Sequence, residues 1–334
     1  MMDRSKLSMR WLEIFLLAAR TGSIQKTAAE SGLSASTVSQ HLHSLQSSLG
    51  VALLDHSKRP MQLTSAGVIF ARYVEDGIRL IRRGETELTT GNWAESRDLR
   101  FGMVDDFDSE VAPELAQFLA TALPKCRFMH YTRPSHAILQ LLVEQKLDAA
   151  VATRPLNDMP GLVEYRLLRD PFVLAVPSSS TFNAEEFLSG KSGLPFLRYS
   201  GAQIIGNLIE IHLRRLKVTL PNRFELESNH SLMGLVAEGS GWAISTPASY
   251  FRAKRFHDRV TLLPFPAKGF ARNLSLFSTD VFPSGMAEVV ASALRRLIAR
   301  NFTEPVVSKV PWLAHEFMVL GGDEPGPAKT ETED

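Results

Sequence analysis

The feature that most constrains the fold is a pair of short helical patterns joined by a very tight turn near residue 33. A short helix begins at Ser23 or Gln25 and ends at Ser31-Gly32 after scarcely two turns. Ser34 then stands at the cap of a helix over residues 35–49. This second helix has one apolar stripe, formed by Val38, Leu42, Leu45 and Leu49. With a preceding helix over residues 7–21, the pattern predicts a helix-turn-helix, in which the second helix faces base edges in the DNA major groove.

The residues that follow predict a wing and a long helix. Two short apolar segments, residues 51–54 and 61–63, flank Ser57-Lys58-Arg59-Pro60, which is typical of a small hairpin with a basic tip. From Ser65 to about residue 90, apolar residues recur at spacings of three and four. A small domain cannot bury so long a helix, so we expect part of it to pack against a second copy of the chain.

Beyond Gly91 strand-like and helical patterns alternate, which predicts parallel sheets with helical crossovers. One set starts at the strand-like residues 99–104, a second set starts near residue 194, and the segment 268–304 is expected to return to the first. We therefore predict two α/β lobes with a cleft between them. Past Glu304 the periodicity is lost, and residues 321–334 are rich in Pro, Gly and charge, which predicts a flexible tail.

Composition excludes several classes of protein. The formal net charge is +1, which neither requires nor excludes a nucleic-acid partner. No apolar run approaches the roughly 18 residues of a membrane span, and no secretory signal is evident, so we expect a cytoplasmic protein with no membrane partner. Cys126 is the only cysteine, which excludes a disulfide within the chain and is interpreted as a structural thiol.

Short polar side chains gather at the start of the predicted recognition helix. Ala35 is suited to contact a thymine methyl group and Gln40 to pair with adenine, while Lys58 and Arg59 on the hairpin are suited to bind phosphates. The predicted DNA-binding residues are Ser34, Ala35, Ser36, Thr37, Ser39, Gln40, His41, Lys58 and Arg59. The alternative is an ordinary helical hairpin with a solvated Ser/Thr face, and the basic hairpin and long helix in the expected order favour the DNA-binding interpretation.

These residues also carry a resemblance to a known family. The segments concerned are Ala28-Ala29, Ser34 to Ser39, Leu42, Leu45, Leu49 to Val51, Leu53-Leu54 and Leu63 to Gly67. Over about residues 8–300 the chain resembles the LysR-type transcriptional regulators. The resemblance implies a winged helix-turn-helix, a linker helix and a two-lobed effector domain like that of periplasmic binding proteins, usually assembled as homotetramers.

The sequence departs from the family pattern at positions that bear on DNA sequence preference. Ala35, Gln40 and Gln46 replace the usual glutamine, arginine and glutamate, and Leu54 and His56 replace the usual phenylalanine and arginine of the wing. The resemblance places the DNA-binding domain at 1–67, the linker helix at 68–95, the effector domain at 96–304 and a C-terminal extension at 305–334. Lobe 1 is expected at about 96–170 and 268–304, and lobe 2 at about 171–267.

The expected effector contacts lie at strand ends and helix starts that face the cleft. The predicted residues are Asp105, Asp106, Phe107, Ser135, Thr153, Tyr199, Ser200, Gly201, Ser228 and Thr246, with Arg154 and Glu227 beside them. Asp105, Asp106 and Asp108 would repel a carboxylate, so we expect a cationic, amine or polyol effector, with Phe107 or Tyr199 available to stack on a cation. The alternative is that these aspartates cap the following helix or face solvent.

Chemistry-bearing motifs are weak elsewhere. Asp106, Asp108 and Glu110 alternate like the start of a calcium loop, but glycine at the sixth position and glutamate at the twelfth are missing. No paired acid and base, phosphate loop, cofactor motif or metal cluster is evident. We therefore expect a ligand-responsive regulator that binds double-stranded DNA and a small effector as a homodimer or homotetramer. The alternatives are a cytoplasmic α/β enzyme or a small-molecule binding protein with an accessory helical domain.

Overall fold

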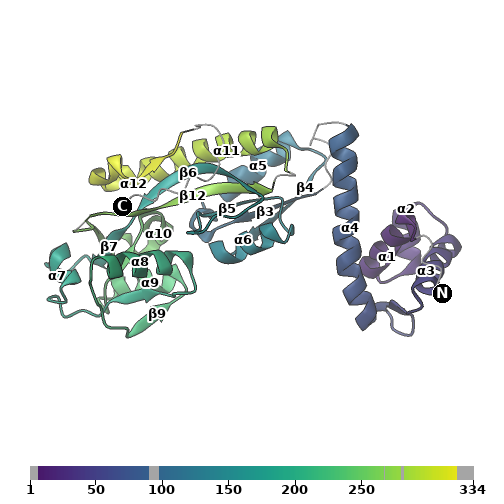
Figure 1. Ribbon diagram of the computed structural model, residues 1–334, viewed down its shortest axis with the longest axis horizontal. Helices are drawn as coiled ribbons and strands as arrows, with labels where there is room; N and C mark the ends of the chain where they lie inside the picture. The colour runs from purple at the N-terminus through teal and green to yellow at the C-terminus, as the bar shows by residue number, and fades with distance from the viewer. Residues whose placement is uncertain (1–6, 90–97, 267, 280–281, 322–334) are drawn as a thin grey trace. The chain divides into compact units, whose positions relative to one another are not determined.

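The computed structural model describes residues 7–89, 98–266, 268–279 and 282–321 (Figure 1). The chain divides into two compact units, unit 1 over residues 1–92 and unit 2 over residues 93–334. Each unit has its own hydrophobic core.

Unit 1 is a winged helix-turn-helix, as predicted. Its elements are α1 (Met9–Thr21), α2 (Ile24–Ser31), α3 (Ala35–Leu49), β1 (Leu54–Asp55), β2 (Gln62–Leu63) and α4 (Ser65–Thr89). The first three helices each end at a glycine in the left-handed region, with φ of 62° at Gly22, 69° at Gly32 and 67° at Gly50. Glycine adopts this conformation without strain, so the helix ends are encoded locally.

The core of unit 1 is built from the apolar stripes of its helices. Ile14 and Phe15 of α1 pack with Val38, Leu42 and Leu45 of α3, and all five are at most 2% exposed. Gln46, which departs from the family pattern, also has a structural role here. Its side-chain oxygen accepts hydrogen bonds from the backbone N–H groups of Leu53 (2.8 Å) and Leu54 (3.1 Å), so it ties α3 to the first strand of the wing.

Lobe 1 of unit 2 is built on a six-stranded sheet of order β13-β6-β12-β5-β3-β4. The strands are β3 (Asp98–Met103), β4 (Arg127–Thr132), β5 (Ala149–Thr153), β6 (Leu162–Pro171), β12 (Ala271–Thr279) and β13 (Met318–Val319). The helices are α5 (Ala112–Ala122), α6 (Ser135–Val143) and α11 (Ser284–Ile298), and the 3-10 turn η2 (Asp105–Phe107) follows β3.

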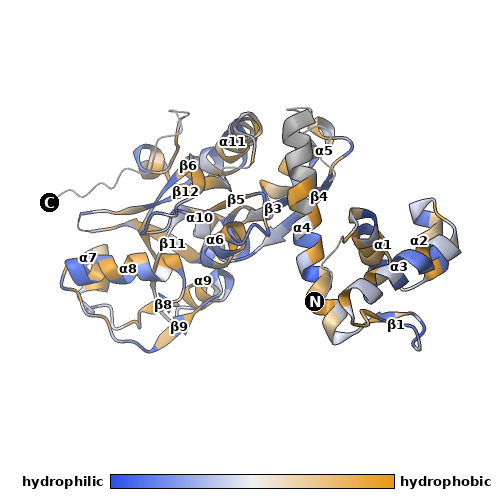
Figure 2. Ribbon diagram, turned by 45° about the vertical axis from the view of Figure 1, so that its right-hand side comes forward, coloured by the Kyte–Doolittle hydropathy of each residue, from blue (hydrophilic) through white to orange (hydrophobic). Residues whose placement is uncertain are grey.

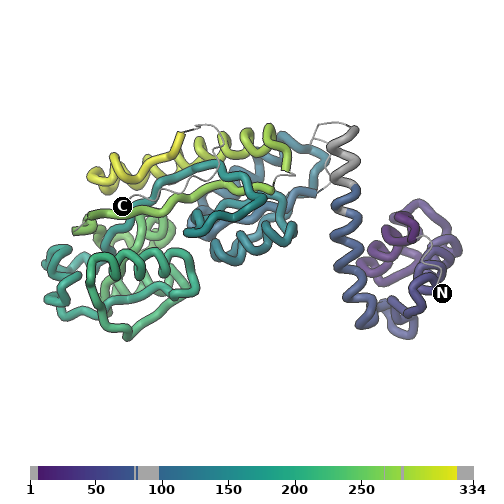
Figure 3. The backbone as a smooth tube through the Cα atoms, viewed as in Figure 1, coloured from purple at the N-terminus to yellow at the C-terminus, as the bar shows by residue number. Residues whose placement is uncertain are grey.

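The expectation of a parallel sheet is wrong for half of lobe 1. Strands β3, β4 and β5 run parallel, but β12 pairs antiparallel with both β5 and β6. The reason is topological, because the chain leaves lobe 1 along β6 and returns along β12. Figure 3 shows these two strands running side by side towards lobe 2.

Lobe 2 contains a three-stranded sheet of order β10-β7-β11 and a parallel pair β8-β9. Both pairs of the three-stranded sheet are antiparallel, so the expectation of a parallel sheet is wrong there as well. The strands are β7 (Val173–Pro177), β8 (Leu197–Tyr199), β9 (Phe224–Leu226), β10 (Ala243–Ser245) and β11 (Val260–Pro264). The helices are α7 (Ala184–Leu188), α8 (Ile204–Arg215), α9 (Asn229–Ala237) and α10 (Pro247–Arg252), followed by the turn η3 (Lys254–Arg259). A parallel bridge between Phe196 and Trp242 joins the two sheets, and Trp242 is 1% exposed, as expected for a core residue.

The chain after α11 is ordered, although its sequence lacks periodicity. A π-helical turn (Ala299–Thr303) continues into α12 (Glu304–Lys309), the 3-10 turn η5 (Pro311–His315) and β13, which pairs with β6. Most of the predicted flexible tail, residues 322–334, lies outside the described residues. Within the described part of the chain, no helix is both long and apolar enough to span a membrane.

Candidate functional site

The predicted DNA-binding residues fall on two surfaces of unit 1. Ser34 caps α3, and its Oγ accepts from the backbone N–H of Thr37 at 3.1 Å. The same Oγ lies 2.8 Å from the hydroxyls of Ser36 and of Thr37. Ala35, Ser36, Ser39 and Gln40 are exposed, whereas Thr37 and His41 are half-buried. Lys58 and Arg59 are exposed on the β1–β2 hairpin, where Lys58 donates to Gln62 at 3.1 Å.

A second candidate site is a cavity of about 240 Å³ in unit 2, between lobe 1 and lobe 2. Lobe 1 contributes Val104, Asp105, Asp106, Pro134, Ser135, His136 and Thr153. Lobe 2 contributes Tyr199, Gln203, Ile204, Ile205, Glu227, Ser228, Asn229 and Ser249, and β12 contributes Arg272. The volume fits a small metabolite, and most of the side chains around it are polar.

A buried polar cluster, defined as Asp106, Thr153, Asp170, Thr246, Ser249 and Arg272, forms one end of this cavity. The Arg272 guanidinium donates to Asp170 at 2.8 Å and to Asp106 at 3.0 Å. The Ser249 hydroxyl of lobe 2 donates to Asp106 of lobe 1 at 3.2 Å. The cluster therefore connects the two lobes through polar side chains that are buried away from solvent.

The charge state of Arg272 follows from its partners. Burial alone would lower the pKa of the guanidinium, but the adjacent Asp106 and Asp170 carboxylates raise it. Arg272 therefore stays protonated and faces two acidic side chains, Asp106 and Asp170. Burial raises the pKa of Asp170, and the adjacent Arg272 lowers it. Acidic side chains thus outnumber basic ones in the cluster.

A second set of hydrogen bonds holds the side chains on the lobe 2 side of the cavity in place. The Tyr199 hydroxyl donates to Asn229 at 2.6 Å and lies 2.8 Å from the Ser245 hydroxyl. The Asn229 amide donates to the Ser249 carbonyl at 2.7 Å. Burial raises the pKa of the Tyr199 phenol well above its usual value, so the ring is a neutral wall of the cavity.

Asp105 differs from Asp106, its neighbour in the chain. Its side chain is 48% exposed and pairs at 2.5 Å with Arg252, at the end of α10 in lobe 2. Partial burial of the Asp105 carboxyl, together with the nearby Asp106 carboxylate, raises the pKa of Asp105 above its ordinary value. Asp105 thus faces the cavity in an environment that favours an additional positive charge.

Six of the ten predicted effector residues line the cavity, and four do not. The six are Asp105, Asp106, Ser135, Thr153, Tyr199 and Ser228. Thr246 is fully buried beneath the cavity as the cap of α10 and as an acceptor from Arg272. Ser200 and Gly201 instead use their backbone N–H groups to bind Leu226 and Glu225.

Phe107 also points away from the cavity. It is 0% exposed and packs edge-to-face on Phe302, with ring centroids 5.2 Å apart. The expectation that Phe107 stacks on a cationic effector does not fit this position, because its ring is enclosed by other side chains. Among the three aspartates, Asp108 lies off the cavity, where it accepts from Thr132 at 2.8 Å.

Sequence reasoning missed several lining residues. The most central is Arg272, which is the second residue of β12. His136, Gln203, Asn229 and Ser249 were also missed. A usable signal existed for the last three, since each lies at or near the start of a helix whose preceding strand end was singled out. Within the described residues, no group of three or more His, Cys, Asp or Glu side chains could hold a metal ion.

Each of the two units matches a known protein family. Residues 9–68 match the bacterial regulatory helix-turn-helix protein, lysR family, and residues 94–299 match the LysR substrate binding domain. The regulator BbuR of Bordetella bronchiseptica is 26% identical over 73% of this chain and 75% of its own length. The hydrogen peroxide-inducible genes activator of Dickeya chrysanthemi is 23% identical over 86% of this chain and 95% of its own length.

Solved structures show the same fold along most of the chain. A cysteine mutant of OxyR from Corynebacterium glutamicum has a TM-score of 0.64 at 18% identity, covering 92% of this chain and 96% of that chain. A probable transcriptional regulator from Pseudomonas aeruginosa has a TM-score of 0.63 at 18% identity, covering 87% of this chain and 97% of that chain. With a helix-turn-helix and an effector-binding domain that both match, the chain belongs to the LysR family of DNA-binding transcriptional regulators, which are not enzymes.

Proposed function

We propose that the cavity of unit 2 binds a small effector that carries a protonated amine, or several hydroxyl groups, in preference to a carboxylate. The observation that carries this proposal is the excess of acidic groups around the cavity. Asp105, Asp106 and Glu227 line it, and Asp170 lies directly behind. Arg272 and Arg252 are the cations paired with these groups, and each is already bound to a carboxylate.

Electrostatics and hydrogen bonding both support this class of ligand. A carboxylate placed beside Asp105 would add a like charge in a partly desolvated site, which is unfavourable. Burial and, after it, repulsion from Asp106 raise the pKa of Asp105, and an ammonium group would relieve that repulsion. Hydroxyl groups would find acceptors in the carboxylates of Asp105 and Glu227.

A thermal-shift experiment on the full chain tests the proposal, with 1,4-diaminobutane and succinate as a pair matched in chain length. We expect 1,4-diaminobutane, ethanolamine or a hexitol to raise the melting temperature of unit 2, and succinate to leave it unchanged. A ligand at one hundred times its Kd stabilises the folded state by about 2.7 kcal/mol, which is readily measured. A shift with succinate but with none of the amines or polyols would overturn the proposal.

Two variants connect the shift to the cavity. Asp105→Asn removes the charge that faces the ligand, so the shift produced by an amine should fall. Asp158→Asn is the matched control, because Asp158 is an exposed aspartate of lobe 1 that does not line the cavity. An equal shift in wild type and Asp105→Asn would remove Asp105 from the site.

We also propose that α3 reads base edges through the exposed residues of its first turns. Ser36, Ser39 and Gln40 extend from the surface, and none is required in the core of unit 1. Lys58 and Arg59 would bind phosphates and set the register of the wing on the duplex. Because Ala35 and Gln40 depart from the family pattern, the half-site should differ from the one that most family members read.

Dimerisation through α4 completes the proposed function. Ile69, Tyr73 and Leu80 lie four and seven residues apart, which places them on one face of the helix, and they are 58%, 63% and 45% exposed. Figure 2 shows apolar positions along this helix. We propose that this stripe packs against the same stripe of a second copy, so that two helix-turn-helix units meet adjacent half-sites.

The peroxide response named for some similar proteins is not proposed here. Cys126 is the only cysteine of the chain and is half-buried. Burial raises its pKa to about 11, so almost none of the reactive thiolate is present at neutral pH. The effector is instead expected to act by binding in the cavity.

A further inference from the structure

We propose that Phe302 is a positioning residue for the effector cavity, held in place by the C-terminal segment, residues 300–321. This segment begins after residue 299, where the match to the LysR substrate binding domain ends. The inference rests on the proposed role of the cavity, but its test requires no effector.

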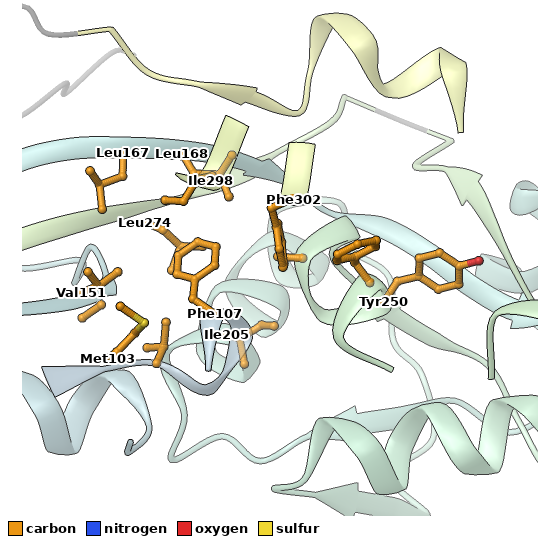
Figure 4. Close-up of a cluster of buried hydrophobic side chains, with 14 of the residues drawn as sticks. Met103, Phe107, Val151, Leu167, Leu168, Ile205, Tyr250, Leu274, Ile298 and Phe302 are labelled. Carbon is orange, nitrogen blue, oxygen red and sulfur yellow. The ribbon is translucent and has the colours of Figure 1, made fainter. Parts of the chain in front are cut away.

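Phe302 touches both lobes with one side chain. Its ring is 0% exposed and lies edge-on to two other rings, with centroids 5.2 Å from Phe107 and 5.0 Å from Phe251. Phe107 belongs to the turn η2 of lobe 1, and Phe251 belongs to α10 of lobe 2. Figure 4 shows the rings of Phe302 and Phe107 beside each other within the buried cluster. Phe302 therefore packs between these two elements and contacts both.

The residues next to these two rings face the cavity. Asp105 and Asp106 share the η2 turn with Phe107, and both line the cavity. Arg252 directly follows Phe251 and forms the ion pair with Asp105. If Phe302 were removed, η2 and α10 would lose the apolar contact that supports their spacing beside the Ser249–Asp106 hydrogen bond and the Arg252–Asp105 ion pair, and Asp105 would move relative to Arg252.

The rest of the segment is anchored on both lobes as well. In lobe 1, Met318–Val319 pairs with β6, Arg169 donates to the Glu316 carbonyl at 2.7 Å, and the Asn301 amide donates to Glu114 at 2.7 Å. On lobe 2, the Lys309 ammonium lies 3.2 Å from Nδ1 of His257 in η3. Leu313 and Phe317 are buried, which gives the segment its own apolar contacts. The C-terminal segment thus contacts both lobes and connects them.

A purely structural role for Phe302 makes a different prediction from a positioning role. A core ring that only fills space would, when truncated, weaken unit 2 as a whole. A positioning ring would loosen the two elements that it touches and leave distant parts of the same unit unchanged. Regional hydrogen exchange distinguishes these outcomes because it measures local opening segment by segment.

The experiment is hydrogen–deuterium exchange of the full chain without effector, comparing wild type, Phe302→Ala, Phe302→Leu and Phe187→Ala. In Phe302→Ala we expect exchange at least tenfold faster in peptides covering residues 104–111 and 246–253. Phe302→Leu keeps most of the apolar volume, so it should restore most of the protection. It also serves as the test variant if Phe302→Ala does not fold, with a smaller increase in the same two peptides.

Phe187→Ala is the matched control, because Phe187 is an equally buried phenylalanine that packs on Trp242 within lobe 2. It should leave exchange of residues 104–111 unchanged. Unchanged exchange of residues 104–111 in both Phe302 variants would overturn the proposal. So would equal acceleration across all of unit 2, or acceleration confined to residues 300–321. A failure of amine binding would contradict the proposed effector class and leave these exchange results unaffected.

Discussion

The start of α3 and the buried polar cluster of unit 2 use similar side chains in opposite ways. At the start of α3, Ser34 bonds to Ser36 and Thr37, two and three residues away, and the surface stays in contact with solvent. In the buried polar cluster, Arg272 bonds to Asp106, which is 166 residues away, and both are at most 6% exposed. The hydrogen bonds at the start of α3 join residues close in the sequence, and water can replace them. Those of the buried polar cluster form only when the whole of unit 2 is folded.

This difference determines how much a substitution lowers the free energy of unfolding. An exposed hydroxyl that is lost leaves water to satisfy its partners, so folding is barely affected. A buried charge that loses its partner keeps the full penalty of desolvation. Substitutions at α3 should therefore change DNA binding at nearly constant stability, and substitutions in the buried polar cluster should change stability first.

The largest effect is expected for Arg272→Met, which leaves Asp106 and Asp170 buried and unpaired. We expect the free energy of unfolding of unit 2 to fall by about 3–5 kcal/mol, measured by urea denaturation with far-UV circular dichroism. The control is Arg259→Met, since the Arg259–Glu238 pair is exposed at 47% and 64% and should contribute at most about 1 kcal/mol. Equal losses in the two variants would show that burial of the cluster does not matter.

The same contrast explains which parts of the fold could be predicted from the sequence. The recognition helix was predicted and observed over residues 35–49, because a Ser cap, an apolar stripe and a Gly end lie within seventeen consecutive residues. Strand β6 was missed and the parallel sheet was wrong in part. The return of residues 268–304 to lobe 1 was predicted, but no local pattern records the direction in which β12 then runs beside β5 and β6.

The candidate site shows this limit at the level of single residues. Asp105 and Asp106 are adjacent in the sequence, yet Asp105 is exposed at the cavity and Asp106 is held by Arg272 and Ser249. Phe107, the third residue of the turn, is enclosed by Phe302, which lies 195 residues further along the chain. The sequence could place this turn at the cleft, since it follows a strand end, but only the packing of distant segments decides where each side chain points.

An intermediate effect is expected for Ile69→Glu, which tests the exposed apolar stripe of α4 in unit 1. A buried isoleucine contributes about 1.5–3 kcal/mol, so the dissociation constant of the dimer should rise at least tenfold, measured by analytical ultracentrifugation. Stability of unit 1 should not change, because Ile69 is 58% exposed. Glu75→Gln, at an exposed polar position of α4, is the control. An Ile69→Glu protein that dimerises like wild type would place the interface elsewhere.

The smallest effect is expected for Ser36→Arg, which should change DNA selectivity alone. Loss of one base-edge contact costs about 1–3 kcal/mol, so binding to the preferred operator should weaken roughly 10- to 100-fold, measured by fluorescence anisotropy at two salt concentrations. Nonspecific binding should not weaken, because the added guanidinium attracts phosphates. Ser48→Arg makes the same change at an exposed position in the last turn of α3 and should leave selectivity intact. If Ser36→Arg instead lowered the stability of unit 1 and kept operator selectivity, the start of α3 would be a structural surface like the buried polar cluster, and the contrast between the two regions would fail.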